Sequence, residues 1–320
     1  MKHVARPALA PIAALLLAAC VPSVRRDPSP EMGRPEAVSL FGNRLYPPEL
    51  PLERRTRLEA QLAEARRAYE ARPADADALI WYGRRLGYLG RYRDAVAIYN
   101  EGIKRHPRDA RLYRHRGHRM ITLRRFEHAI RDLRLAAHLT SRQPDQVEPD
   151  GPPNEQNIPL STLQGNIWFH LGLAHYMRGE WGRAAESFRQ ALARARNDDA
   201  VVAASDWLYM SLRRGGRTAE AARVLERIRR DMTIVENTGY HRRLLMYRGE
   251  LTADSVLAGE GDGMHLANQS YGVGNWHLYN GRRREAEDIL WRVVQAENWA
   301  PFGYIAAEAD LHRLERSGRR

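Results

Sequence analysis

The sequence predicts an all-α solenoid, a stack of antiparallel helix pairs, and three observations lead to it. Residues 168–191 carry two apolar stripes at helical spacing, which are separated at Gly179 where the pattern breaks. Gly83 and Gly117 occupy equivalent places 34 residues apart, so the same unit recurs. A single helix pair of this length cannot bury its own apolar face, and neighbouring units must therefore stack into one continuous core.

The expected elements follow one another along the chain. A first helix from Pro51 to Pro73 caps the stack, because Pro suits a first helical turn. Gly117 and Gly172 are 55 residues apart, one unit plus 21, which places an insertion near 142–164. The remaining units are helix pairs at 76–109 and 110–143, a pair at 168–191, another around Ala221, a degenerate pair at 235–260, a pair at 268–294, and a closing helix at 300–320 that forms the second cap.

The order of large and small residues resembles the tetratricopeptide repeat family. Its landmarks here are Trp168, Leu171, Gly172, Tyr176, Ala184, Phe188 and Ala191. The resemblance implies a right-handed superhelix in which the first helix of each pair lines a concave groove that binds a protein or peptide. Carried over position by position, it implies a basic and aromatic groove of Arg84, Tyr88, Arg111, Arg114, His118, Phe169, Tyr176, Met210 and Arg213.

The positive charge is concentrated in the first two helix pairs. The chain has 51 Lys and Arg against 39 Asp and Glu, a formal +12, and residues 76–143 alone hold 16 basic and 6 acidic residues. Such a field favours acidic partners: an acidic peptide, a phosphorylated glycan, an anionic lipid or nucleic acid. A solvated, arginine-rich helix face explains the same excess, and the sequence leaves both interpretations open.

The N-terminal segment predicts export and lipid anchoring. Lys2 and Arg6 precede an apolar run of signal-peptide length that ends at Cys20, the single cysteine of the chain. Residues 17–20 (LAAC) resemble the lipobox of bacterial lipoproteins, which implies a signal peptide at 1–19, acylation of Cys20 and a membrane anchor facing the periplasm. Val21, not Asp, follows the cysteine, which by resemblance favours the outer membrane. Export removes the chain from nucleic acid, and a lone cysteine excludes an internal disulfide.

Residues 20–50 are rich in proline and lack periodicity, so they predict an extended tether before a solenoid at 51–320. Four side chains are too apolar for a free linker, and they are expected to dock on the first helix: Leu40, Phe41, Leu45 and Tyr46.

The insertion at 142–162 contains five prolines and four acidic residues: Asp145, Glu148, Asp150 and Glu155. Two hypotheses remain open for it. It is either an internal acidic strap over the basic groove or an inert spacer.

No catalytic or cofactor motif is present, so the protein is predicted not to be an enzyme and to hold no cofactor. His115 with His118, and His170 with His175, are weak metal candidates, whereas satisfied histidines at helix interfaces are commoner. The predicted function is a tetratricopeptide-type adaptor or scaffold lipoprotein of the bacterial envelope that binds an acidic protein or peptide. The alternatives are an enzyme or small-ligand protein that uses the groove and the insertion, and a purely structural lipoprotein. The oligomeric state is left open.

Overall fold

The structure is a computed structural model that describes residues 33–149, 154, 156–258 and 263–318. The chain divides into two units, Met1–Gly33 and Arg34–Arg320, and everything below concerns the second. The predicted signal peptide, the lipobox cysteine Cys20 and the tether up to residue 32 lie outside the described residues. Within the described residues, no helix is both long and apolar enough to cross a membrane.

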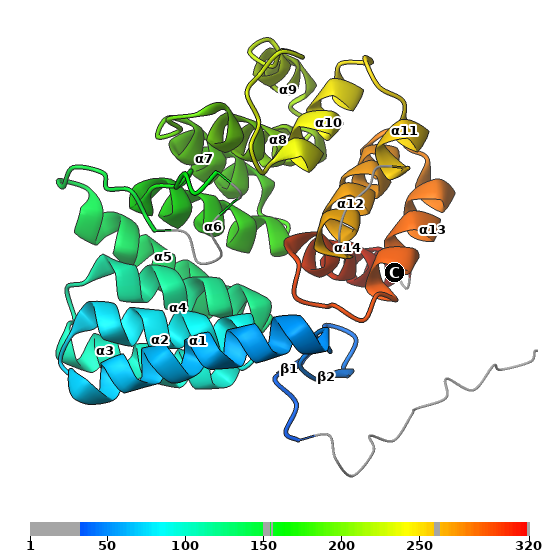
Figure 1. Cartoon of the computed structure of the whole chain (residues 1–320). Coiled ribbons are helices and arrows are strands. Elements are labelled where there is room, and N and C mark those ends of the chain that lie inside the picture. Colours follow the sequence, from blue (N-terminus) through cyan, green and yellow to red (C-terminus); the bar gives the residue numbers. More distant parts are fainter. Residues whose placement is uncertain (1–32, 150–153, 155, 259–262, 319–320) are drawn as a thin grey trace, which may run out of the picture. The chain divides into compact units, whose positions relative to one another are not determined.

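Helices make up almost all of the described unit, and the predicted all-α class is confirmed (Figure 1). Consecutive helices pack against one another within each pair and between pairs, except α9 and α10, which gives a helix-pair solenoid. The helices are α1 Leu52–Ala71, α2 Ala76–Tyr88, α3 Tyr92–Arg105, α4 Ala110–Thr122, α5 Phe126–Thr140, α6 Leu163–Met177, α7 Trp181–Leu192, α8 Asp198–Arg214, α9 Thr218–Leu225, α10 Thr238–Tyr247, α11 Ala253–Leu257, α12 Gly263–Tyr279, α13 Arg283–Val294 and α14 Phe302–Gly318.

Local sequence signals start the helices and reverse the chain between them. The Asp75 side chain caps α2 by accepting from the backbone N–H of Asp77 at 2.8 Å, and Asp109 caps α4 in the same way. The turn between α2 and α3 needs a left-handed residue, which Gly90 supplies with φ +77°. The equivalent residue between α4 and α5 is Arg124, which adopts φ 59° although it has a side chain. That residue must therefore be held by its tertiary contacts.

The recurring glycines allow the two helices of a pair to approach closely. A Cβ at Gly172 of α6 would lie 2.7 Å from the ring of Phe188 of α7. Gly83 and Gly117 meet Tyr99 and Leu133 in the same manner. Any side chain at these positions would push the pair apart, since packed interiors have little room to adjust.

Replacing Gly172 with alanine is therefore expected to lower the free energy of unfolding by about 1–3 kcal/mol through overpacking. Urea unfolding followed by circular dichroism measures this change. Gly182 of α7 is a matched control, because a Cβ there meets nothing within 4 Å, and alanine at this helical position should be neutral or stabilising. Equal losses in the two variants would contradict the close-packing explanation.

A short hairpin precedes the helices, where the sequence predicted an extended tether. Strands β1 Ala37–Val38 and β2 Arg44–Leu45 pair antiparallel, with Ala37 opposite Leu45. The ring of Phe41 stacks on Trp291 of α13 at 5.6 Å, and the Trp299 indole donates to the carbonyl of Tyr46. The expected docking on α1 is therefore wrong, because the hairpin packs on the C-terminal helices.

The closing helix α14 also does more than cap the last pair. It packs against α12 and α13, which precede it, and also against α6, which is distant in sequence. Its Asp310 is fully buried and accepts hydrogen bonds from Arg214 of α8 at 2.8 Å and from Arg313 at 2.6 Å. Burial alone raises the pKa of Asp310, but these two guanidinium groups more than offset it and hold that pKa at about 2. The C-terminal helix is therefore part of the core formed by the middle repeats.

Candidate functional site

The predicted groove residues of the middle repeats lie in the core. Tyr176 and Met210 have no exposed surface, and the hydroxyls of Tyr176 and Tyr271 are 2.7 Å apart. Arg213 donates to Asn280 at 2.9 Å and lies 4.4 Å from the ring centroid of Tyr279. The expectation that Tyr176 and Met210 line an open groove is wrong, because α12 and α14 pack where a partner would lie.

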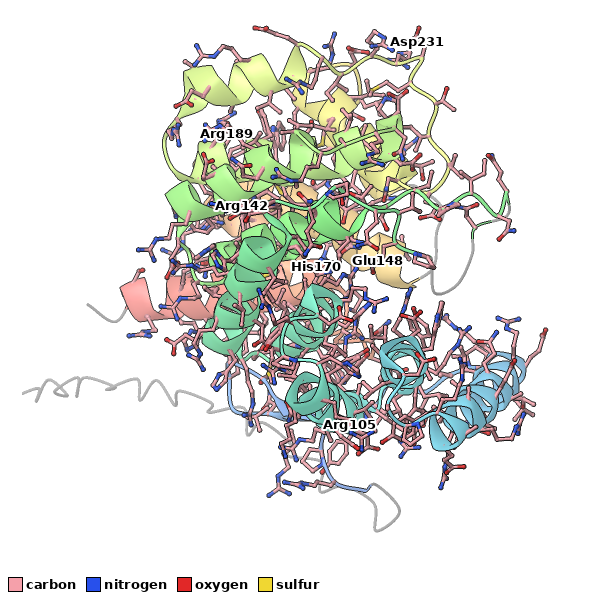
Figure 2. All side chains as sticks on the ribbon, turned by 90° about the vertical axis from the view of Figure 1, so that its left-hand side faces the viewer. Arg105, Arg142, Glu148, His170, Arg189 and Asp231 are labelled. Atoms are coloured by element: carbon pink, nitrogen blue, oxygen red, sulfur yellow. The ribbon has the colours of Figure 1, made fainter. Side chains whose placement is uncertain are left out.

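The predicted residues of the first repeats, in contrast, come together. Arg84 and Tyr88 of α2 and Arg114 and His118 of α4 line one cavity of about 130 Å³. We call it the arginine-histidine cavity; its other charged or imidazole-bearing residues are His115, Arg119, Glu148 and His170. Figure 2 labels Glu148 and His170, which enter it from the insertion and from α6. Sequence reasoning did not place His115 and Arg119 in the groove, because basic residues occur on every face of α4.

The Arg114 side chain is the most deeply placed cation of this cavity. It is 8% exposed, and its Nη2 lies 2.9 Å from Oε1 of Glu148. Its Nη1 donates to Nδ1 of His115 at 3.2 Å. Within the described residues, Nε of Arg114 and Oε2 of Glu148 have no hydrogen-bond partner. The buried ion pair is therefore incomplete, although buried polar groups are nearly always satisfied.

The imidazoles of this cavity are held neutral. Nε2 of His118 accepts from Arg119 at 2.7 Å, and Nδ1 of His170 donates to the carbonyl of Asn166 at 2.7 Å. Burial is the largest cause that lowers the pKa of His115, His118 and His170 well below 6.5, and the neighbouring guanidinium groups add to it. Neutral rings can pack, and those of His118 and His170 are 4.4 Å apart at their centroids.

Acidification is expected to destabilise the protein through these histidines. Their folded pKa lies below the unfolded value of about 6.5, so below that pH the unfolded chain binds more protons and stability falls as the pH falls. Each ring that stays neutral contributes a slope approaching about 1.4 kcal/mol per pH unit. Urea unfolding at pH 7 and pH 5 should show a smaller difference for His118→Asn than for the parent. The exposed His128 of α5 is the control, and an equal reduction in His128→Asn would contradict this origin.

The described part of the insertion lies over the basic residues, as the strap hypothesis expected. The insertion occupies the connection between α5 and α6, where its two limbs pair: Glu148 donates its backbone N–H to the Ser161 carbonyl at 3.0 Å. Arg84 donates to the carbonyl of Pro149 at 2.8 Å. We call residues 145–149 and 156–162 the strap. Asp150 and Glu155, two of the four predicted acidic residues, lie outside the described residues.

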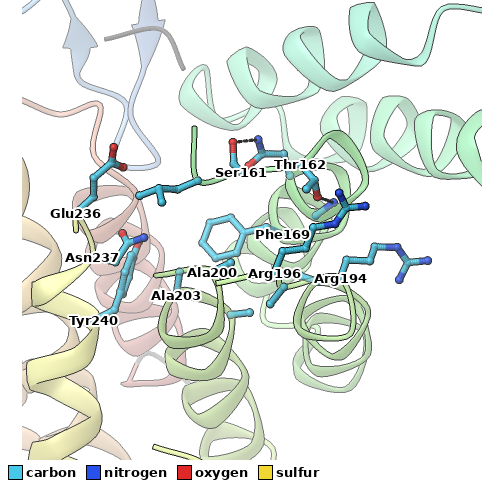
Figure 3. A pocket seen from close by; sticks show the side chains of 16 residues that line it. Ser161, Thr162, Phe169, Arg194, Arg196, Ala200, Ala203, Glu236, Asn237 and Tyr240 are labelled. Atoms are coloured by element: carbon cyan, nitrogen blue, oxygen red, sulfur yellow. Dashed lines mark hydrogen bonds between the residues drawn. The ribbon is translucent and has the colours of Figure 1, made fainter. Parts of the chain in front are cut away.

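Each limb of the strap borders a hollow. The basic hollow, about 220 Å³, is named for Arg84 and Arg111; the carboxylates of Asp77 and Glu148 also line it. There Arg111 pairs with Asp109 at 2.6 Å and with Asp77 at 2.5 Å. The aromatic hollow, about 230 Å³, lies beside the other limb and is lined by Ser161, Asn166, Phe169, Arg196 and Tyr240 among others (Figure 3). Among the groove residues predicted beyond the first two repeats, Phe169 lines this hollow, whereas Tyr176 and Met210 lie in the core.

A comparison with protein families identifies one unit directly. Residues 165–198 match the tetratricopeptide repeat. This segment contains α7 and all of α6 except its first two residues, and the two helices are in contact at Gly172 and Phe188. Among curated proteins, none matches this sequence.

Solved structures of similar helical arrangement include a tetratricopeptide repeat protein from Parabacteroides merdae, at 13% identity and a TM-score of 0.47, covering 80% of this chain and 93% of that one. The pilF protein of Pseudomonas aeruginosa has 15% identity and a TM-score of 0.45, covering 83% and 91%. YrrB, described as a tetratricopeptide repeat protein with an unusual peptide-binding site, has 17% identity and a TM-score of 0.39, covering 78% and 97%.

The match to the tetratricopeptide repeat bears on the kind of ligand that such hollows bind. Stacked helix pairs produce extended concave surfaces, and proteins with this repeat generally bind proteins or peptides there. Among the described residues, no group of three or more His, Cys, Asp or Glu could hold a metal ion. The side chains that line the cavity and the two hollows carry guanidinium, imidazole, carboxylate, amide and aromatic groups.

Proposed function

We propose that this protein is a non-catalytic, lipid-anchored adaptor or scaffold of the bacterial envelope that binds an acidic protein or peptide segment. The observation that carries the proposal is the pair of hollows on either side of the strap, one basic and one aromatic. An extended segment that crosses the strap would place an acidic side chain at Arg84, beside Arg111, and an apolar side chain between Phe169 and Tyr240. Arginine supports this choice because it binds carboxylates in a fork and also stacks on aromatic rings.

The charge of the first repeats supports an acidic partner. Arg84 hydrogen-bonds only to neutral groups among the described residues, the Tyr88 hydroxyl at 3.3 Å and the Pro149 carbonyl at 2.8 Å. A carboxylate that approaches it would meet a cation without a charged competitor. Electrostatic attraction of this kind mainly raises the association rate and the specificity, and it weakens with salt.

The test is affinity capture from envelope extract with three baits, followed by mass spectrometry. The parent is compared with Arg84→Ala, Arg111→Ala and with the control Arg131→Ala, Arg134→Ala, which removes equal charge from exposed positions on α5. We expect a protein that binds the parent and the control but not the groove variant. Identical sets of retained proteins on all three baits would refute the partner site.

The envelope location is tested separately at the predicted lipobox. Labelled palmitate should enter the parent, and the protein should sediment with membranes. Both properties should be lost in Cys20→Ser. Incorporation of label into Cys20→Ser, or a parent that stays in the supernatant, would refute the lipid anchor.

A further inference from the structure

The arginine-histidine cavity has the size of a site for one small group. Its volume is about 130 Å³, whereas one water needs roughly 10–15 Å³ of such space. The cavity is lined by side chains from α2, α3, α4, α6 and the strap. It therefore has room for a compact polar group beside the side chains that line it.

The charges that line the cavity do not balance. Three guanidinium groups, those of Arg84, Arg114 and Arg119, face one carboxylate, that of Glu148. Among the described residues, Arg84 and Arg119 form no ion pair with a carboxylate; Arg119 donates to the neutral His118 and lies over the ring of Tyr92. The cavity therefore holds two more positive than negative charges. Arg114 is buried, and Arg84 and Arg119 are half-buried, where an uncompensated charge is less well solvated than at the surface.

The carboxylate that is present does not satisfy the donors. Glu148 uses only Oε1 toward Arg114, and it leaves its own Oε2 and Nε of Arg114 without partners. A carboxylate has two oxygens in one plane, whereas the guanidinium groups come from two different helices. An anion with oxygens in four directions and a double negative charge matches this arrangement better.

We propose that the arginine-histidine cavity binds a phosphate group between Arg84, Arg114 and Arg119, and that Glu148 of the strap occupies part of that place when no phosphate is bound. The phosphate is either the free ion or the terminal group of a phosphate monoester, which share this chemistry. The inference goes beyond the adaptor function, because it needs no protein partner. The capture experiment and the anion titration can therefore fail independently.

The imidazoles of the cavity would add a hydrogen-bond donor toward the anion and would take up protons when it binds. His115 accepts at Nδ1 from Arg114, so its Nε2 carries the proton and is a further donor toward an anion. A bound dianion would favour the protonated ring of His170, and phosphate binding should be accompanied by proton uptake. Titrations in two buffers of different ionisation enthalpy measure that uptake.

The test is calorimetric titration of the purified protein with inorganic phosphate, and in parallel with glycerol 3-phosphate as a minimal monoester, in a buffer without other oxyanions. We expect saturable binding of at least one of them. Glu148→Gln removes the competing charge and should tighten binding about tenfold, and Arg119→Gln should weaken it about tenfold. Arg131→Gln on the exposed face of α5 is the control and should bind as the parent does.

The two arms separate the sources of the phosphate. Binding of inorganic phosphate indicates the free ion, whereas binding of the monoester alone indicates a phosphorylated molecule; each supports the site. No saturable binding of either, in both the parent and Glu148→Gln, would overturn the proposal. Binding that is equal in the parent, Glu148→Gln, Arg119→Gln and Arg131→Gln would overturn it as well, since it would not come from this cavity. Circular dichroism of each variant verifies that it is folded.

Discussion

Replacing Asp206 with alanine is expected to lower the free energy of unfolding by about 3–5 kcal/mol. Asp206 of α8 is fully buried and accepts two hydrogen bonds from Arg243 of α10, at 2.6 and 3.1 Å. Arg243 is 1% exposed and also donates to the carbonyl of Asn268 of α12 at 3.1 Å. Without the carboxylate, a guanidinium group would remain buried and uncompensated between three helices. The loss is large beside the 5–15 kcal/mol that is typical of a whole domain.

Urea unfolding of Asp206→Ala measures this loss, and Asp231→Ala is its control. Asp231 forms an ion pair with Arg229 at 3.2 Å, but its side chain is 82% exposed (labelled in Figure 2), so its removal should change stability by less than about 0.5 kcal/mol. The double variant Asp206→Leu, Arg243→Met should recover much of the loss, because it removes both charges. A loss in Asp206→Ala no larger than that in Asp231→Ala would show that the buried pair is not needed.

Replacing Glu308 with alanine is expected to cost a similar amount and also to release the N-terminal hairpin. Glu308 of α14 is 1% exposed and accepts from Arg124 at 2.6 and 3.0 Å, while its other oxygen accepts from the backbone of Leu40. Arg124, which adopts a positive φ in the turn between α4 and α5, would lose its carboxylate partner and keep its hydrogen bonds to the carbonyls of Thr122 and Trp299. One substitution thus affects the second repeat, the hairpin and the last helix.

Limited proteolysis with trypsin provides the second measurement for Glu308→Ala. Cleavage at the exposed Arg44 of the hairpin should become faster relative to the parent. Glu287→Ala, which removes a helix-surface pair with Arg283 at 2.7 Å, is the control and should leave cleavage unchanged. Unchanged cleavage in Glu308→Ala as well would show that Glu308 is not needed to hold the hairpin.

The helix pairs were predictable because their signals are local. The 34-residue spacing, the glycines at 83, 117 and 172 and the aspartates before α2 and α4 each act within one unit. The placement of Arg84, Tyr88, Arg114 and His118 around a common cavity follows from the same local rules, since first helices of neighbouring pairs lie side by side.

The burial of Tyr176 and Met210 could not be predicted, because it depends on contacts between distant parts of the chain. The hydroxyl of Tyr271, about 95 residues after Tyr176, reaches that tyrosine from α12, and α14 returns to α6. The sequence also did not indicate which acidic residue of the insertion would pair with Arg114, and the structure shows that it is Glu148. A position within a repeat specifies which way a side chain points but not what later folds over it.

The contact between Arg124 and Glu308 also limits how many helix pairs the protein can contain. Open stacks of repeats tolerate the gain or loss of a unit, because each unit contacts only its neighbours. Here a turn of the second repeat, the hairpin and the last helix share one carboxylate, so an added or deleted pair would move Glu308 away from both partners. Duplication of a single repeat between Arg124 and Glu308 would therefore break the contact that joins these two residues.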